Sequence, residues 1–415
     1  PADGTPTETR DAILLAARAS SQADHDTLAA AFARRGLGSC AVSMPRDSLV
    51  FTGVVESLEV HANVIAEAPV LAAFSSCDRD DVVDAGERGR IVLAISNRGG
   101  KSLAGATAAL TTTTPGVSVT SSPIVLDLDS YEATAIAFDF VLDPTITEPV
   151  DGAFELSIRG GDSCQDPLTI AIPARLNVDD VVSSSATDSF DAGSSPWQST
   201  FVAIWKLHRE TALDGSWRGV APAVFSDGSL ESPPLTAGSG PLTLSFTHRY
   251  SFETTNGSVF DGGVIEYSLD GSTWIDVMTL VPAIPYGATP LAGVGNALAG
   301  RVGFTGNSPG YPATETLTLD FGTQLADQMF KIRFRLATDN TNASAGWDVD
   351  DVVFTGIVGT PFPVQIADAT ACSDAPPTDG GSEPPVVDGG CCGTGTPTSG
   401  LLALLVLVAL RRRER

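Results

Sequence analysis

Alternation of apolar and polar residues with a period of two recurs along most of this chain and constrains its fold more than any other feature. The pattern covers Leu242–Phe246, Gly263–Ser268, Leu317–Phe321 and Lys331–Leu336, and turns such as Asp270-Gly271 separate such runs. Successive side chains of a strand point to opposite faces, so the pattern predicts half-buried strands. No helical period persists after about residue 40. We therefore expect a mainly β protein.

The order of these patterns divides the 415 residues into parts. Residues 69–178 carry short strands with turns at the spacing of an Ig-like β-sandwich. Residues 188–358 predict an antiparallel jelly-roll, and a Ser-rich linker, 179–187, precedes it. Residues 359–390 are a Pro/Gly-rich linker that we expect to be disordered. The remaining parts are residues 1–68, a helical hairpin with a connector, and residues 391–415, a tail.

Two helices are predicted before residue 40. Thr5-Pro6-Thr7-Glu8 is a capping box with proline at the first helical position, and Gly36 is typical of a left-handed helix stop. Two short helices cannot bury a core of their own. We expect them to pack on a domain that precedes Pro1.

The tail combines three features in order: Cys391-Cys392, an unbroken apolar run at 401–410, and four arginines within the last five residues. The run predicts a short hydrophobic helix, shorter than the ~20 residues of a full membrane span, which suits a transient anchor. The arginines are expected to remain cytoplasmic, with the rest of the chain outside. A buried C-terminal helix is the alternative, but the run has no polar face.

This order resembles the Cys-containing C-terminal sorting tails of myxobacterial surface proteins. The resemblance covers only the last twenty-five residues. It implies export to the cell surface, an envelope sorting or processing protease as a partner, and cleavage or lipid attachment at Cys391 and Cys392.

The charge of the chain excludes one class of partner. With 50 acidic and 24 basic residues the formal net charge is −26. There is no basic stripe to displace counterions, so we expect no nucleic acid binding. The acidity fits an exported protein or one that takes calcium. No signal peptide precedes Pro1, and we expect a fragment or processed form of an exported protein.

Thr9-Arg10-Asp11-Ala12-Ile13-Leu14, followed by Ala31–Gly38, resembles the closing helices of fungalysin-type (thermolysin-like) zinc metallopeptidases. The resemblance covers residues 5–60 and implies the end of a missing catalytic domain, with proteins or peptides as substrates. That family binds zinc through a His-Glu-x-x-His helix. The four histidines here, His25, His61, His208 and His248, include no pair four residues apart, so no catalytic residue is present. The zinc would belong to the missing domain; an unrelated helical hairpin is the alternative.

The motifs Ser245–Tyr250, Asp261–Ser268 and Gly346–Val352 resemble MAM-like jelly-roll modules of secreted bacterial metallopeptidases. This resemblance implies a module that binds partners or substrates without catalysing a reaction. The stretch from Asp80 to Gly99 resembles bacterial surface Ig-like modules, which are usually spacers.

Acidic residues supply two candidate calcium sites, because calcium prefers several carboxylate oxygens. One is Asp78, Asp80 and Asp84, for which a solvated acidic loop is the alternative. The other is Glu253, Asp261, Asp350 and Asp351 in the jelly-roll. Of the six cysteines, Cys77 and Cys164 lie near the two ends of the Ig-like domain, and we predict a disulfide between them.

Together these features favour the non-catalytic C-terminal portion of an exported, cell-surface zinc metalloendopeptidase. A non-enzymatic surface adhesin or binding protein is the alternative, although it leaves the N-terminal helices unexplained. A carbohydrate-active enzyme needs paired acids facing one cleft and ranks below both.

Overall fold

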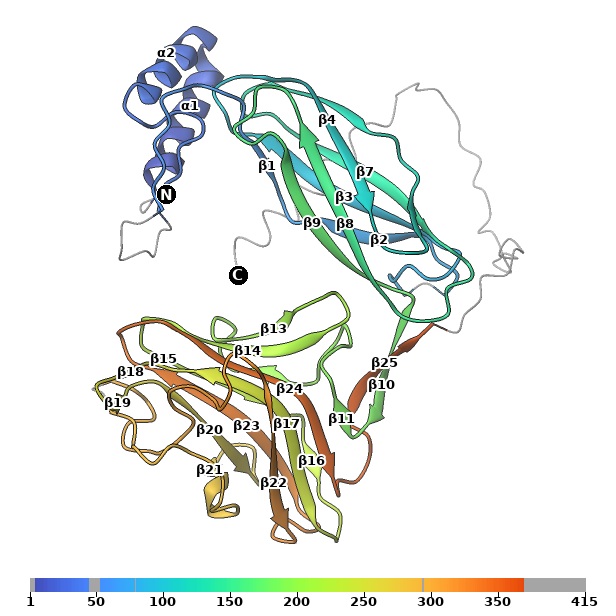
Figure 1. Cartoon of the computed structure of the whole chain (residues 1–415), viewed down its shortest axis with the longest axis vertical. Coiled ribbons are helices and arrows are strands. Elements are labelled where there is room, and N and C mark those ends of the chain that lie inside the picture. The colour runs from blue at the N-terminus through green and yellow to red at the C-terminus, as the bar shows by residue number, and fades with distance from the viewer. Residues whose placement is uncertain (1–3, 45–52, 79, 293–294, 369–415) are drawn as a thin grey trace, which may run out of the picture. The chain divides into compact units, whose positions relative to one another are not determined.

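The structure is a computed structural model that describes residues 4–44, 53–78, 80–292 and 295–368. Two helices come first and strands dominate the rest, which confirms the mainly β prediction (Figure 1). Within the described residues, no helix combines the length and apolar character needed to cross a membrane. The apolar run 401–410, Cys391, Cys392 and the linker after residue 368 lie outside the described residues.

The two helices, α1 (Pro6–Ser20) and α2 (Gln22–Ala33), form a hairpin. The capping box is present: Glu8 donates its backbone N–H to the Thr5 hydroxyl, and Thr5 donates its own to the Glu8 carboxylate at 2.9 Å. Gly36 has a φ of +83°, the left-handed conformation that glycine adopts without strain, and ends the hairpin. Local signals therefore account for both helices.

The first sandwich consists of two antiparallel sheets. One contains β1 (Val64–Ala66), β2 (Val70–Ser75), β3 (Arg88–Asn97), β5 (Val117–Val119) and β7 (Ala133–Leu142). The other contains β4 (Leu103–Thr112), β6 (Ile124–Leu128), β8 (Val150–Arg159) and β9 (Leu168–Leu176). Alternate residues of β3, such as Ile91 and Leu93, are fully buried and pack with Phe138 and Leu156 between the sheets.

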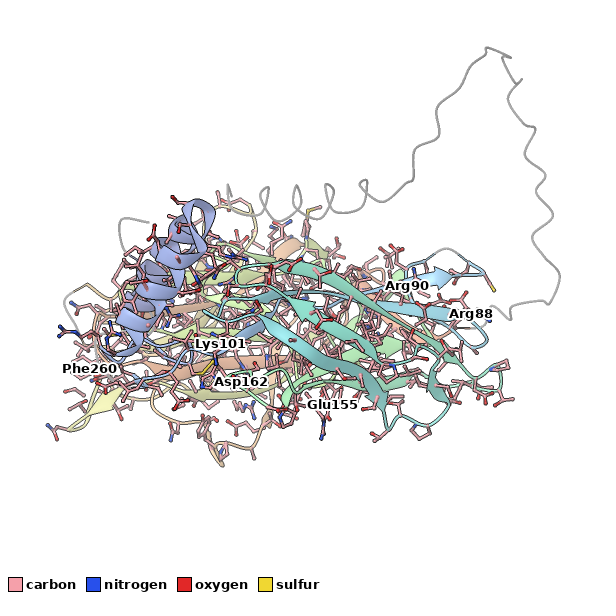
Figure 2. All side chains as sticks on the ribbon, turned by 90° about the horizontal axis from the view of Figure 1, so that it is seen from above. Arg88, Arg90, Lys101, Glu155, Asp162 and Phe260 are labelled. Carbon is pink, nitrogen blue, oxygen red and sulfur yellow. A yellow bond between two sulfur atoms is a disulfide. The ribbon has the colours of Figure 1, made fainter. Side chains whose placement is uncertain are left out.

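The helical hairpin packs on loops at one end of the first sandwich. The ring of His25 meets that of Tyr131 edge-on at 5.9 Å, and Gly100 donates its backbone N–H to the Ser39 hydroxyl at 3.1 Å. Lys101 and Asp162 form an ion pair of 3.2 Å at this end (Figure 2). The helices thus have a packing partner within this chain, which corrects the expectation that they need a preceding domain.

A disulfide joins Cys40, after the hairpin, to Cys164 between β8 and β9. The predicted Cys77–Cys164 pair is therefore wrong. Cys164 donates its backbone N–H to the carbonyl of Ala62, just before β1, and β1 pairs with the last residues of β3. Cys77 instead lies before the first residue of β3. The first and last residues of this ten-residue strand are about 30 Å apart. Cys77 is itself disulfide-bonded.

The second sandwich also consists of two antiparallel sheets. One contains β11 (Thr187–Asp188), β13 (Trp205–Arg209), β14 (Gly215–Ala221), β17 (Leu242–Ser251), β22 (Glu315–Gly322) and β24 (Ser344–Thr355). The other contains β12 (Gln198–Ser199), β15 (Ser226–Glu231), β16 (Leu235–Thr236), β20 (Gly262–Ser268), β21 (Ile275–Asp276) and β23 (Met329–Thr338). A small hairpin, β18 (Thr254–Thr255) and β19 (Ser258–Val259), and a 3-10 helix, η1 (Val277–Thr279), complete it.

The strand order of the second sandwich is that of a jelly-roll. Counting from β14, the eight main strands are β14, β15, β17, β20, β21, β22, β23 and β24. They form sheets in the orders 1-8-3-6 and 2-7-4-5, the eight-stranded double Greek key. A core that includes Phe246, Phe334 and Trp347 fills the space between the sheets.

Strand β20 is buried along its whole length. The segment between η1 and β22 covers its outer face, where Leu291 and Leu298 pack on Val264, and Ile265 donates its backbone N–H to the Tyr286 hydroxyl at 2.7 Å. The prediction that Gly263–Ser268 is half-buried is therefore wrong, because its outer face is covered by protein instead of water.

The segments that precede and follow the second sandwich in sequence pair with each other as a two-stranded ribbon. β10 (Val178–Ser185) pairs antiparallel with β25 (Phe362–Ala367), and Val178 lies opposite Ala367. The linker predictions for 179–187 and for the first part of 359–390 are therefore wrong. Each strand satisfies its backbone through a partner almost two hundred positions away in sequence, which composition does not reveal.

Candidate functional site

Three buried carboxylates meet at one end of the second sandwich. Glu253 follows β17, Asp261 precedes β20 and Asp339 follows β23; none is more than 7% exposed. Their ligand oxygens lie within 4.8 Å of one another. Because β20 and β23 are antiparallel neighbours, the residue before one strand lies beside the residue after the other.

The contacts of this cluster come from neutral groups. Asp261 accepts from the backbone N–H of Asp339 at 2.9 Å, and its second oxygen has no partner. Glu253 accepts from the Asn342 amide at 2.6 Å and the Thr341 hydroxyl at 3.0 Å. Burial, with the charges of Asp339 and Glu253 adding to it, raises the pKa of Asp261 to about 7. Three carboxylates and one unpartnered oxygen are the donor set that a hard cation such as calcium takes.

The structure brings together two of the four predicted calcium ligands of the jelly-roll, Glu253 and Asp261. Asp350 and Asp351 lie instead on β24, where Asp350 faces Thr247. Thr247 is four residues before the end of β17, which places Asp350 about 13 Å along the strand from that end. Burial raises the pKa of Asp350 to about 7, but Asp339 takes its place in the cluster. Asp339 joins the cluster because it directly follows the strand that pairs with β20, and one sequence does not show that pairing.

The three acidic residues predicted in the first sandwich also meet. Asp78, Asp80 and Asp84 lie in the loop between β2 and β3, with ligand oxygens within 4.8 Å of one another. Asp84 is 2% exposed. Burial is the main cause that raises its pKa to about 8, followed by the charges of Asp80 and Asp368.

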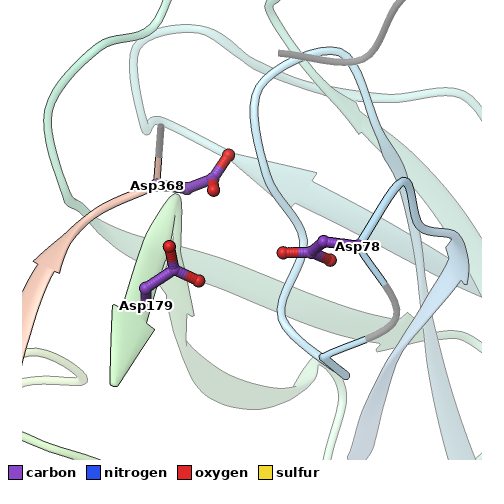
Figure 3. A group of neighbouring side chains, drawn as sticks. All are labelled: Asp78, Asp179 and Asp368. Carbon is purple, nitrogen blue, oxygen red and sulfur yellow. The ribbon is translucent and has the colours of Figure 1, made fainter. Parts of the chain in front are cut away.

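Asp78 belongs to a second group that the sequence analysis did not identify. Asp179, on β10, and Asp368, directly after β25, bring carboxylate oxygens within 4.8 Å of it (Figure 3). No local motif links these three residues, which lie about 100 and 190 positions apart in sequence. Only the pairing of β10 with β25 places the last two side by side.

The outer face of the sheet formed by β14, β24 and β17 has an open pocket of about 420 Å³. Arg218, Asp348 and Arg249 lie in one row across these three strands, each opposite the next. Arg218 binds both Asp348 oxygens, at 2.7 and 3.0 Å, and Arg249 donates its Nε–H to one of them at 2.8 Å. Tyr311 and Pro312 complete one side of the pocket.

A bulge forms the floor of this pocket. The register between β14 and β24 shifts between Gly219 and Ala221, and Gly346 has a φ of +93°. A Cβ at Gly346 would lie only 1.9 Å from the carbonyl oxygen of Gly219, so only glycine fits. The sequence motifs that resemble MAM-like modules include Arg249 and Asp348, but the sequence analysis gave them no role.

The zinc implied by the N-terminal resemblance does not fit the described residues. The groups of potential ligands that the described residues bring together contain only carboxylates, whereas typical zinc sites include histidine or cysteine. His25 is fully buried beside Tyr131, and His61 contacts Glu59 and Asp162 at 2.7 and 2.9 Å.

No protein-family model and no curated protein matches the chain. Solved structures similar to it include the K1 cleaved adhesin domain of Lys-gingipain from Porphyromonas gingivalis W83, with 13% identity and a TM-score of 0.26 over 41% of this chain and 96% of that one. The secreted serine protease VesC from Vibrio cholerae has 11% identity and a TM-score of 0.20 over 68% of this chain and 49% of that one. A structure of carbohydrate-binding modules from the β-sandwich super family has 9% identity and a TM-score of 0.23 over 70% of this chain and 98% of that one.

Proposed function

We propose that this chain is the non-catalytic, ligand-binding portion of an exported, cell-surface zinc metalloendopeptidase. Two motifs of this chain resemble the end of such an enzyme, and the contact between them supports the proposal that a metalloendopeptidase is the parent protein. Arg10, 3% exposed, donates to the backbone carbonyls of Leu37 and Gly38, so the Arg-Asp-Ala-Ile helix is fastened to the Gly-Leu-Gly segment. Arg10 also pairs with Asp11 at 2.7 Å, so its buried guanidinium group is compensated by one carboxylate and two backbone carbonyls.

The arginine pocket of the second sandwich is the observation that carries the binding function. Two guanidinium groups share one carboxylate, which leaves one excess positive charge at the pocket. Arg249 also donates to the carbonyl of Pro312 at 3.2 Å, which holds its side chain over the pocket. At about 420 Å³ the pocket has the volume of sites for small ligands, ~300–1,000 Å³.

The ligand that fits this pocket best carries a single carboxylate. A guanidinium group binds carboxylates through paired N–H donors. A chain of net charge −26 repels a polyanion strongly, whereas it repels a single carboxylate on an otherwise neutral peptide far less. The C-terminus of a peptide or protein meets this condition, and Tyr311 offers an aromatic face for the adjoining side chain. The module would thus bind cut or native protein ends for its parent enzyme.

Binding of N-acetylated tetrapeptides, with free or amidated C-termini, tests this function by calorimetry. We expect Arg249→Gln to weaken binding of the free acids about 10- to 100-fold, the effect of losing a hydrogen bond to a charged group. Arg90→Gln is the matched control, because Arg90 pairs with Asp139 across β3 and β7 in the first sandwich (Figure 2). Equal affinity for acids and amides, or an Arg249→Gln variant that binds like the wild type, would exclude the proposal.

The packing of the helical hairpin favours a second candidate, a non-enzymatic surface adhesin. His25 on Tyr131 and Arg18 beside Asp129 make the hairpin a local cap of the first sandwich. Sequencing the gene upstream of Pro1 separates the two. An in-frame His-Glu-x-x-His codon run with a downstream Glu supports the peptidase, and a signal peptide immediately before Pro1 supports the adhesin.

A further inference from the structure

Two overlapping groups of carboxylates meet where the chain leaves the first sandwich. Asp78, Asp80 and Asp84 come from the loop between β2 and β3, and Asp179 and Asp368 come from the end of the β10–β25 ribbon at which Val178 faces Ala367. We call this end the ribbon mouth. Asp78 belongs to both groups, and each group has its ligand oxygens within 4.8 Å of one another.

Asn177 holds the loop and the ribbon mouth together. Its backbone N–H donates to Val83 at 3.1 Å and its side-chain carbonyl accepts from Ala85 at 3.0 Å, both in the loop. Its backbone carbonyl accepts from Asp368 at 3.3 Å. Asn177 is 1% exposed, and its φ of 56° is a left-handed conformation that asparagine tolerates. These hydrogen bonds hold the loop against the ribbon mouth, which brings the carboxylates of the two segments together.

Asp84 distinguishes this cluster from an ordinary acidic surface loop. The residue is 2% exposed, and neither of its carboxylate oxygens has a hydrogen-bond partner. The side chain is aimed at Asp78 and Asp80, whose ligand oxygens lie within 4.8 Å of one of its own. A buried carboxylate without donors is costly, and native proteins retain one when a cation or a proton compensates it.

We propose that Asp78, Asp80 and Asp84 bind a calcium ion, and that Asp179 and Asp368, linked to them through Asp78, complete a calcium clasp between the loop and the ribbon mouth. The donors are all carboxylate oxygens, which suit hard cations and not zinc or copper. They come from three separate segments, and calcium accepts six to eight oxygens in flexible geometry, whereas magnesium requires a near-ideal octahedron and retains water. The clasp does not depend on the arginine pocket.

Calcium titration of the EGTA-treated full chain by calorimetry tests the clasp. Extracellular modules bind calcium with Kd of roughly 0.1–1 mM, and we expect that range here. Asp84→Asn and Asp179→Asn are expected to weaken this binding at least ten-fold. Asp81→Asn is the matched control: Asp81 lies in the same loop, is exposed, belongs to neither group, and has a φ of 75° that asparagine also adopts.

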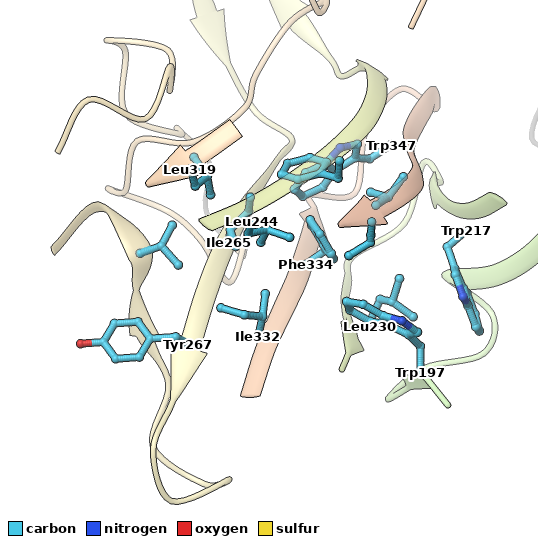
Figure 4. Close-up of a cluster of buried hydrophobic side chains, with 14 of the residues drawn as sticks. Trp197, Trp217, Leu230, Leu244, Ile265, Tyr267, Leu319, Ile332, Phe334 and Trp347 are labelled. Carbon is cyan, nitrogen blue, oxygen red and sulfur yellow. The ribbon is translucent and has the colours of Figure 1, made fainter. Parts of the chain in front are cut away.

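Thermal unfolding separates the clasp from the carboxylate cluster of the second sandwich. All five tryptophans lie between residues 197 and 347, and Trp197, Trp217 and Trp347 are in the core of the second sandwich (Figure 4). Fluorescence therefore reports that sandwich, and calorimetry reports both. Unfolding of the first sandwich, which contains no tryptophan, is the fluorescence-silent transition. We expect Asp84→Asn to raise the melting temperature of this transition in the absence of calcium and to abolish the response of the transition to calcium.

Two results would overturn the clasp. One is a calcium response in Asp84→Asn equal to that in Asp81→Asn. The other is a fluorescence-silent transition that does not move at millimolar calcium in the wild-type protein. A calcium shift of the fluorescence transition alone would place the ion at Glu253, Asp261 and Asp339 and would equally reject the clasp.

Discussion

His248 is held neutral by its surroundings in the core of the second sandwich. It is 2% exposed, and Trp347 donates its indole N–H to Nδ1 at 3.2 Å. Because indole only donates, Nδ1 accepts and the proton resides on Nε2, 3.6 Å from a Glu315 oxygen. Glu315 favours the charged imidazole, but burial opposes it more strongly and lowers the pKa of His248 to about 4.

This depressed pKa predicts that the second sandwich loses stability in acid. Above pH 6.5 the imidazole is neutral in both states; between pH 6.5 and 4 the unfolded chain binds a proton that the folded protein does not. Stability therefore falls as the pH drops through this window, by about 3 kcal/mol at its lower end. Tryptophan-detected urea unfolding of the wild type and His248→Gln measures it. An identical pH dependence in the variant would contradict the assignment.

At the residue scale, the sequence predicted which carboxylates of one loop lie together better than it predicted which distant carboxylates join them. Glu253, Asp261, Asp78, Asp80 and Asp84 were predicted from their chemistry, and the structure groups them as expected within each domain. Asp339, Asp179 and Asp368 were missed because they join through strand pairing, which one sequence does not show. Arg249 and Asp348 were visible only as parts of a motif, since their roles depend on being opposite each other.

At the scale of elements, the disulfide between Cys40 and Cys164 ties the helical hairpin to the first sandwich across 124 residues. In the chain-entropy view, a loop of this length stabilises by at most about 5 kcal/mol. We expect the Cys40→Ser/Cys164→Ser double variant to lower the fluorescence-silent melting transition and to leave the tryptophan transition in place. An unchanged melting temperature of the fluorescence-silent transition would show that helix packing alone holds the hairpin on the first sandwich. Cys77 is untouched in this variant, so its own disulfide persists.

Elements defined by local signals were predictable, and those defined by distant partners were not. The capping box and Gly36 fixed the helices, and alternation located strands such as β17, whose residues alternate in burial along its length. β10 and β25 lack such a pattern: β10 is mostly exposed, and the strand that pairs with it, β25, is distant in sequence. The covered outer face of β20 was also beyond local inference, because the covering segment is itself irregular.

At the scale of the whole molecule, a net charge of −26 and a carboxylate cluster in each sandwich predict that calcium stabilises each sandwich separately. For the second sandwich, calcium at ten times its Kd adds about 1.4 kcal/mol, and the tryptophan transition should rise by roughly 3–5 °C. Asp261→Asn should remove this rise. Asp350→Asn, which removes a half-buried carboxylate in the same sandwich but outside the cluster, should retain it. No rise in the wild type at millimolar calcium would exclude this site.

The pairing of β10 with β25 also has a mechanical consequence. The chain enters and leaves this ribbon at the same end, because Val178 faces Ala367. A force that pulls the residues before β10 away from those after β25 therefore loads the hydrogen bonds one pair at a time, as in opening a zipper, instead of loading them together in shear. Asp179 and Asp368 lie at the first pair to open. A calcium ion held there would set the tension at which this protein begins to lengthen.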